Sequence, residues 1–175
     1  MARLPDEFRM AIFAVPGDGG ENDRFFFLWS IGMKTSARNQ FSGTVLRVTA
    51  GAVNDEVALT VPGMDAEIVA IVTHGSAVEL GLVPGARAFA LVKASSIIVV
   101  TDAEGARFSA RNRLQGTVTQ VQAGAVNSEV VIGLPGGGAV AAIITNESCA
   151  ALGLVPGAAA SALFKASNVI VGVPA

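Results

Sequence analysis

The chain has 175 residues, of which 51% are hydrophobic and 15% charged, with a net charge of −2. This slightly acidic balance argues against nucleic-acid binding, which normally requires a basic face. No apolar run reaches the ~18 residues of a membrane-spanning helix, so no membrane association is expected. A single cysteine, Cys149, excludes an internal disulfide and a cysteine-based metal cage. Residues 1–7 lack the apolar core of a secretory signal, so we expect a cytoplasmic protein.

A tandem repeat organises the chain. Ser36-Ala37-Arg38-Asn39 returns as Ser109-Ala110-Arg111-Asn112, and 15 of the 22 positions in 36–57 are identical in the second copy. Lys93-Ala94-Ser95 likewise returns as Lys165-Ala166-Ser167. Two units of about 65 residues are each small for a stable core. The high apolar content therefore predicts burial between the units and between subunits, in a homo-oligomer.

The first 33 residues differ from the repeats. Turn formers and acidic residues in 16–23 predict a flexible break, and the aromatic cluster 25–29 follows it. Asp23 is a candidate cap for a short helix here. We expect residues 1–33 to form a linker or helical segment that packs on the repeats or on a partner subunit.

The spacing of apolar residues within each copy predicts strands. In the first copy these are expected at 41–48, 56–61, 66–72, 87–92 and 96–100, with one or two helical turns at 76–80. Five short strands with one brief helix before the fourth predict a small OB-like barrel in each copy. We therefore expect an all-β protein of two tandem five-stranded barrels, at 34–101 and 107–175, joined by a short linker.

One set of polar residues that both copies share consists of cations and hydrogen-bond donors, without a carboxylate among them. They are Ser36, Arg38, Asn39, Thr73, Ser76, Lys93 and Ser95 in the first copy, and Ser109, Arg111, Asn112, Thr145, Ser148, Lys165 and Ser167 in the second. Such a set suits a small oxyanion, because arginine offers a planar fork and lysine a point charge. Plainer interpretations remain open: the threonines as helix caps, and the cations as solvated surface charges.

The sequence around Thr73 adds a second feature, because it precedes the predicted helix, where free backbone N–H groups attract anions. In the second copy Glu147 stands where the first copy has Gly75. A carboxylate at that place repels a dianion unless it points outward. The two sites are therefore expected to differ in affinity.

Little in the sequence indicates catalysis. His74 is the only histidine and is replaced by Asn146 in the other copy, so it reads as an exposed loop residue. Cys149 is expected to be a packing thiol. Glu56 and Glu129 are the matched carboxylates, and they follow a hairpin turn as structural residues would. We predict a binding protein and not an enzyme, without an organic cofactor or a bare metal cation.

Several of these motifs, in order, resemble the Mop family of molybdate-binding (molbindin) domains. They are Thr-Ser-Ala-Arg-Asn-Gln at 35–40, Gly-Thr-Val at 43–45, the segment 71–82 and Lys-Ala-Ser at 93–95. Two copies resemble the di-Mop module of ModE-type molybdate-responsive regulators and of free-standing molbindins. The resemblance covers residues 33–173. The 35 residues before Ser36 are too few for the winged-helix domain of such regulators.

The resemblance implies OB-like (Mop/TOBE-type) barrels that bind molybdate or tungstate between adjoining barrels, often across subunits, with the arginine of one barrel meeting the lysine of another. Carried over by motif, the ligands would be Ser36, Arg38, Asn39, Thr73, Ser76, Lys93, Ala94 and Ser95, and Ser109, Arg111, Asn112, Thr145, Ser148, Lys165, Ala166 and Ser167.

The leading hypothesis is a cytoplasmic, oligomeric molybdate- or tungstate-binding protein for molybdenum sensing or homeostasis. Its alternative is a ligand-poor dimerisation or interaction module of a transcriptional regulator. A third reading, an enzyme acting on a phosphorylated small molecule, lacks a candidate base.

Overall fold

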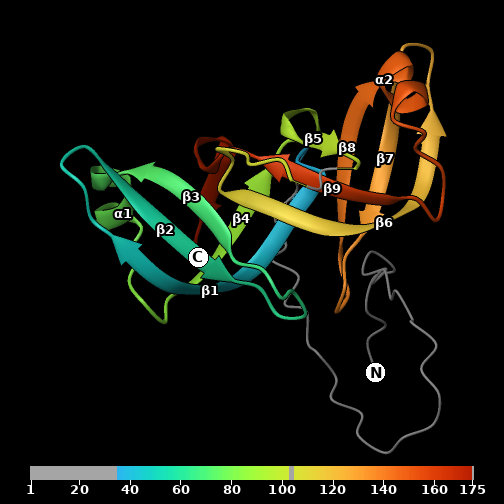
Figure 1. Ribbon diagram of the computed structural model, residues 1–175. Helices are drawn as coiled ribbons and strands as arrows, with labels where there is room; N and C mark the ends of the chain where they lie inside the picture. The colour runs from blue at the N-terminus through green and yellow to red at the C-terminus, as the bar shows by residue number, and fades with distance from the viewer. Residues whose placement is uncertain (1–34, 103–104, 175) are drawn as a thin grey trace, which may run out of the picture.

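The computed structural model describes residues 35–102 and 105–174 (Figure 1). The predicted segment 1–33 therefore lies outside the described residues. The first copy contains β1 (Asn39–Thr49), β2 (Asn54–Thr60), β3 (Ile68–Thr73), α1 (His74–Glu79), β4 (Arg87–Val92), the 3₁₀ turn η1 (Ala94–Ser96) and β5 (Ile98–Val100). The second contains β6 (Asn112–Ala123), β7 (Asn127–Gly133), β8 (Ala139–Thr145), α2 (Asn146–Ala151), β9 (Ala159–Phe164), η2 (Ala166–Asn168) and β10 (Val169–Gly172).

The strands form two five-stranded sheets, in the orders β10-β4-β1-β2-β3 and β5-β9-β6-β7-β8. All their pairings are antiparallel. Each sheet curls into a barrel, because its outer strands contact each other, β10 with β3 and β5 with β8. The prediction of an all-β chain with two five-stranded barrels and one short helix in each copy is thus confirmed.

The first strand of each copy is long enough to belong to both sides of its barrel. β1 pairs with β4 along its first half and with β2 along its second, and the register shifts between Val45 and Arg47. Such a bulge bends the strand and increases its twist. Gly43 lies just before the bend, where an added Cβ would stand 2.0 Å from the carbonyl oxygen of Thr60. Glycine is required there because the two backbones touch.

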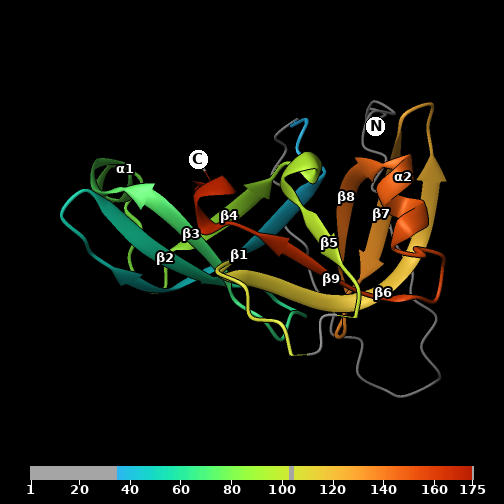
Figure 2. The ribbon, with the colours of Figure 1, turned by 45° about the horizontal axis from the view of Figure 1, so that its top comes forward.

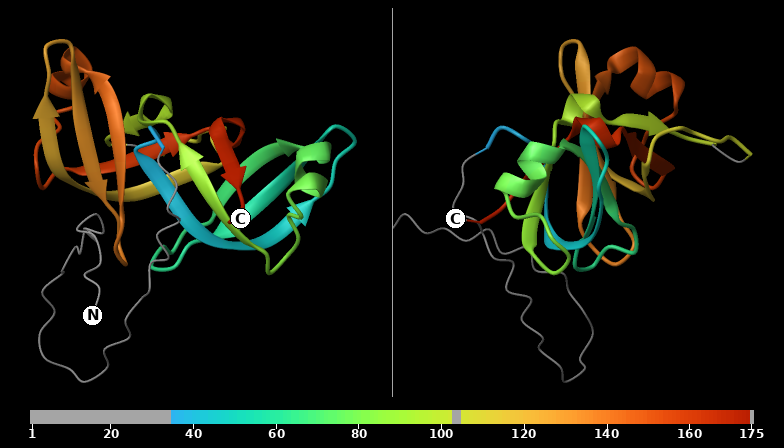
Figure 3. Two further views of the ribbon diagram at one scale, coloured as in Figure 1. Left: turned by 180° about the vertical axis from the view of Figure 1, so that it is seen from behind. Right: turned by 90° about the vertical axis from the view of Figure 1, so that its left-hand side faces the viewer.

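The fifth strand of each barrel comes from the other copy. β5 pairs with β9 in the second sheet, and β10 pairs with β4 in the first. Figure 2 shows β5 beside β9, and Figure 3 shows the C-terminal strand in the barrel of the first copy. The expectation that each copy supplies all five strands of its own barrel was wrong, because β5 and β10 are both short apolar strands that fit either sheet by pattern.

Side-chain size indicates why the strands exchange. Gly172 opposes Phe89, and a Cβ at Gly172 would lie 2.4 Å from the ring. In the second sheet the same two places hold Val100 and Ser161. If β5 stayed in its own barrel in the same register, Val100 would collide with Phe89, whereas Gly172 over Ser161 would leave a gap. Both costs are avoided by the observed exchange.

We expect Gly172→Val to lower the free energy of unfolding by about 1–3 kcal/mol, the usual cost of overpacking. Adding Phe89→Ser in the same chain recreates the Val–Ser pair of the other sheet, so the double variant should lose less than the sum of the two single variants. Urea unfolding of the three variants measures this coupling. Strictly additive losses would contradict the size-matching explanation.

Candidate functional site

The two shared motifs of each copy lie side by side in the structure. Asn39, the first residue of β1, opposes Val92, the last residue of β4. Arg38 and Lys93 are the next residues on either side of this pair, so they extend the ladder together. Asn112 opposes Phe164 in the second barrel in the same way. Each copy therefore places its arginine beside its own lysine, at the end of the barrel that faces the other copy.

We call this region the waist: the starts of β1 and β6 with η1 and η2. η1 contacts β8 of the second barrel, and η2 contacts β3 of the first. Lys93 and Lys165 precede these turns and are exposed, as are Ser95 and Ser167. Ala94 and Ala166 are buried. Ser36 and Ser109 are exposed at the same ends.

The two asparagines bind the opposite barrel through their amide groups. Asn39 accepts from the backbone N–H of Ala141 at 2.7 Å and donates to its carbonyl at 2.9 Å. Asn112 makes the same pair of bonds with Val69, at 2.7 and 2.8 Å. Both side chains are buried. Their hydrogen bonding joins the barrels, and a role as oxyanion ligands stays a prediction.

The arginines reach across the waist to carboxylates. Arg38 Nη2 lies 3.3 Å from Glu129 Oε2 on β7, and Arg111 Nη1 lies 2.8 Å from Glu56 Oε2 on β2. Both arginine side chains are more than half exposed. Sequence reasoning treated the glutamates as structural residues of the hairpins and missed that they neutralise the predicted anion-binding arginines. The identity of both pairs in the two copies was the available signal.

The structure does not bring the helix-start residues to the waist. Thr73 and Thr145 cap α1 and α2 by accepting from the backbone N–H of Ser76 and Ser148, and the paired hydroxyls bond at 2.8 Å. These helices lie at the outer ends of the barrels (Figures 1 and 3). Ala141 marks the waist end of β8, because it bonds Asn39. Thr145 lies four residues further along the same strand, which is roughly 13 Å from that contact. The helix-cap interpretation accounts for these contacts within one chain.

His74 is not a loop residue as expected, because it is the first residue of α1. Its Nδ1 lies 3.0 and 3.1 Å from the carboxylate oxygens of buried Asp55. In the second copy Ser128 donates to the side-chain oxygen of Asn146 at 2.8 Å. The paired replacement of Asp–His by Ser–Asn was visible in the sequence and could have predicted this contact.

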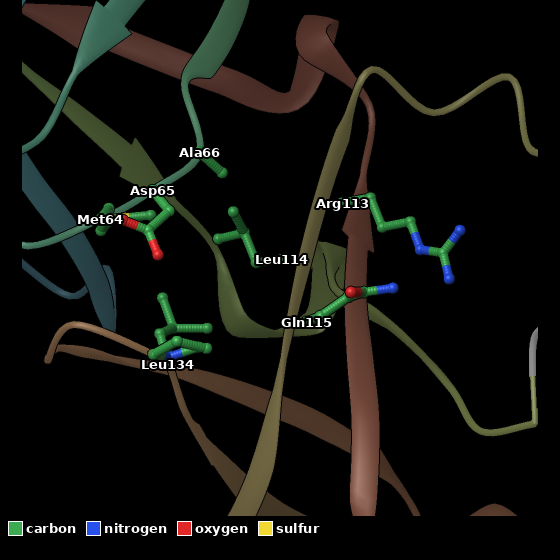
Figure 4. A pocket seen from close by; sticks show the side chains of 8 residues that line it. Met64, Asp65, Ala66, Arg113, Leu114, Gln115 and Leu134 are labelled. Carbon is green, nitrogen blue, oxygen red and sulfur yellow. The ribbon is translucent and has the colours of Figure 1, made fainter.

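Two open clefts lie near the waist. One of about 320 Å³ is lined by Met64–Ala66, Arg113–Gln115 and Leu134 with Pro135. In Figure 4 the Arg113 side chain points away from Asp65 and Met64. The other, of about 630 Å³, lies along β6 and β9. Neither contains a predicted ligand. Within residues 35–102 and 105–174, no group of three His, Cys, Asp or Glu side chains could hold a metal ion.

Comparison with known proteins identifies the repeated unit. The TOBE domain matches residues 35–99 and, a second time, residues 109–171. The chain belongs to the TOBE-domain family. No helix in the described part of this TOBE protein is long and apolar enough to cross a membrane.

Its relatives are Mop-type proteins. The chain is 46% identical over 147 residues to the molybdenum-pterin-binding protein MopA of Rhodobacter capsulatus, covering 84% of this chain and 55% of MopA. It is 45% identical over 156 residues to the molybdenum transport protein ModE of Azotobacter vinelandii, covering 89% of this chain and 57% of ModE. The chain thus spans about half the length of these curated relatives.

A solved structure, the cytoplasmic molybdate-binding protein ModG with molybdate bound, is similar over 81% of this chain and 100% of that chain, with 50% identity and a TM-score of 0.78. The tandem Mop/TOBE arrangement inferred from the motifs is thereby confirmed.

Asn112→Ala should lower the free energy of unfolding by about 1–3 kcal/mol, because it leaves the backbone N–H and carbonyl of Val69 without partners in a buried place. Asn112→Asp should also be destabilising, since a carboxylate cannot donate to that carbonyl. Urea unfolding without added anions measures both. A wild-type stability in both variants would show that the asparagine does not hold the barrels together.

The stability of the first barrel should depend on pH in the acid range. The backbone N–H of Gly51, and then the ring of His74, hold the pKa of Asp55 below its ordinary value of 3.8. The ionised side chain therefore stabilises the fold above pH 3.8, and this contribution is lost as pH falls through the lowered pKa. The stability difference between wild type and Asp55→Asn should shrink below that pH. The neutral counterpart, Ser128→Ala, should show a difference without this pH dependence.

Proposed function

We propose that this chain binds molybdate or tungstate at the waist, as a cytoplasmic, oligomeric protein of molybdenum sensing or homeostasis. The observation that carries the proposal is the similarity, at 50% identity, over the whole of the molybdate-bound ModG chain. The paired arginine and lysine in each copy supply the chemistry, because together they match the charge of a tetrahedral dianion.

The ligand groups we propose fall into two sets. The waist set combines Arg38 and Lys93, or Arg111 and Lys165, with the neighbouring serine and backbone N–H groups. These cations are exposed, so an anion from solvent can reach them. The spacing of the donors would favour molybdate over the smaller sulfate. The outer set, the Thr–Ser pairs at α1 and α2, would contribute only if a second copy brought its own cations to those ends.

Oligomerisation of the chain is part of the proposal. Apolar side chains are exposed at matching places in both copies, including Val53 and Val126 at 72% and 69%, and Ile98 and Ile170 at 65% and 67%. Exposed apolar residues that recur in this way favour contact with further copies.

A ligand-poor interaction module is the second candidate. The observation that favours it is the neutralisation of both waist arginines by Glu56 and Glu129. The chain would then contribute assembly, and not anion binding, to a longer regulator such as the ModE relatives that it partly spans.

Calorimetric titration with molybdate, using sulfate and phosphate as controls, distinguishes these candidates, and light scattering gives the mass. We expect binding of molybdate but not of sulfate, and a mass above that of one chain. Lys93→Ala with Lys165→Ala should weaken binding about tenfold to a hundredfold, the cost of a lost charged hydrogen bond.

Arg113→Ala provides the matched control, because it removes an exposed cation outside the shared motifs. If the lysine variants bind molybdate as wild type does, the site assignment is wrong. An equal response to all three anions, or none, would favour the interaction module.

A further inference from the structure

The two waist arginines are held by their glutamates in different ways. Arg111 bonds both oxygens of Glu56, with Nη2 at 2.9 Å from Oε1 and Nη1 at 2.8 Å from Oε2. Arg38 makes one contact with Glu129, from Nη2 at 3.3 Å. The first pair is bidentate and short, and the second is single and long. The two copies are therefore inequivalent at their most similar motif.

This difference bears directly on anion binding. A guanidinium recognises an oxyanion through the same pair of parallel N–H groups that it offers to a carboxylate. In Arg111 that fork is already occupied by Glu56, whereas Arg38 keeps part of its fork free. A dianion that approaches Arg111 must displace a carboxylate from it. Each glutamate also repels the incoming negative charge at short range.

We propose that Glu56 and Glu129 act as internal competing anions that set the oxyanion affinity of each waist site, and that the Arg38 site binds more tightly than the Arg111 site. The inference rests on the proposed function, because it assumes that both arginines are ligands. It identifies two affinity-determining residues that do not themselves bind the anion, and it fixes the order of the two sites.

The exposure of the arginine side chains favours a role of the glutamates as competitors for the anion, and not as groups that hold the arginines in place for it. The arginine side chains are 62% and 55% exposed, for Arg38 and Arg111 respectively. Water can therefore replace a lost carboxylate, and the removal of a glutamate leaves no buried unpaired charge. Lys93 and Lys165 have no ion pair within the described residues, so their charges remain available when an arginine is released.

Variants with one waist site each allow the two affinities to be measured separately. Arg111→Ala leaves the Arg38 site, and Arg38→Ala leaves the Arg111 site. In calorimetric titration, we expect molybdate to bind the Arg111→Ala protein about tenfold more tightly than the Arg38→Ala protein. Adding Glu56→Gln to Arg38→Ala should raise its affinity about tenfold, whereas adding Glu129→Gln to Arg111→Ala should raise it only about twofold.

Glu67→Gln is the matched control, because it makes the same change in the Arg47–Glu67 pair within the first barrel. It should leave both affinities unchanged, and thermal unfolding of every variant reports whether the fold is kept. A loss of affinity in the Glu56→Gln variant, or equal affinity of the two single-site proteins, would overturn the inference. Absence of molybdate binding by the wild-type chain would instead overturn the proposed function.

Discussion

The exchange of the last strands determines how the rest of this protein is arranged. β5 and β10 each close the barrel of the other copy, so neither barrel is complete without both halves of the sequence. η1 and η2 directly precede the exchanged strands and must lie where the chain crosses from one barrel to the other. The Lys-Ala-Ser motifs are therefore at the waist because of the exchange. Arg38 and Arg111 join them through the register of β1 with β4 and of β6 with β9.

The buried asparagines supply hydrogen bonds to the outer strand of the opposite sheet. β3 and β8 are the outer strands of their sheets, and an outer strand has backbone N–H and carbonyl groups without partners. An asparagine side chain carries the same donor and acceptor as a peptide group. Asn112 therefore pairs with Val69 as one more residue of a strand would, and Asn39 does the same with Ala141. Each barrel thus provides hydrogen-bond partners for the outer strand of the other.

Much of the fold could be predicted from the sequence, because the repeat aligned each strand with its counterpart. The fourth strand was predicted with the observed bounds, and the short helix was predicted two residues late, since Thr73 caps it. The exchange of β5 and β10 could not be predicted by periodicity, because it depends on which side chain faces Phe89. A comparison of Phe89 and Gly172 with Ser161 and Val100 would have been needed, together with the register.

The candidate site could also be predicted in part by comparing the two copies. Identity between the copies indicated the waist residues, but it did not separate anion ligands from groups that join the barrels. Asn39 and Arg38 are equally identical in the two copies, and only the structure shows that one is buried against Ala141 and the other exposed beside Glu129. The same identity also included Glu56 and Glu129, whose meaning depends on a contact between copies.

The differences between the copies also separate residues that act within one barrel from residues at the contact between barrels. The first barrel has two ion pairs of its own, Asp55–His74 and Arg47–Glu67. In the second copy both partners of each pair are replaced, as Ser128 with Asn146 and Gln120 with Ala139.

Replacement of both partners is expected when the loss of one would leave the other uncompensated, most of all for buried Asp55. Pairs inside a barrel were thus free to change together. The pairs that cross the waist join two copies, and there the arginines, asparagines and glutamates are the same in both. A structural need common to both copies explains the asparagines, which lie in buried contacts. The ion pairs with Glu129 and Glu56 account in the same way for Arg38 and Arg111. Lys93 and Lys165 have no ion pair within the described residues, so neither kind of contact accounts for their identity in the two copies.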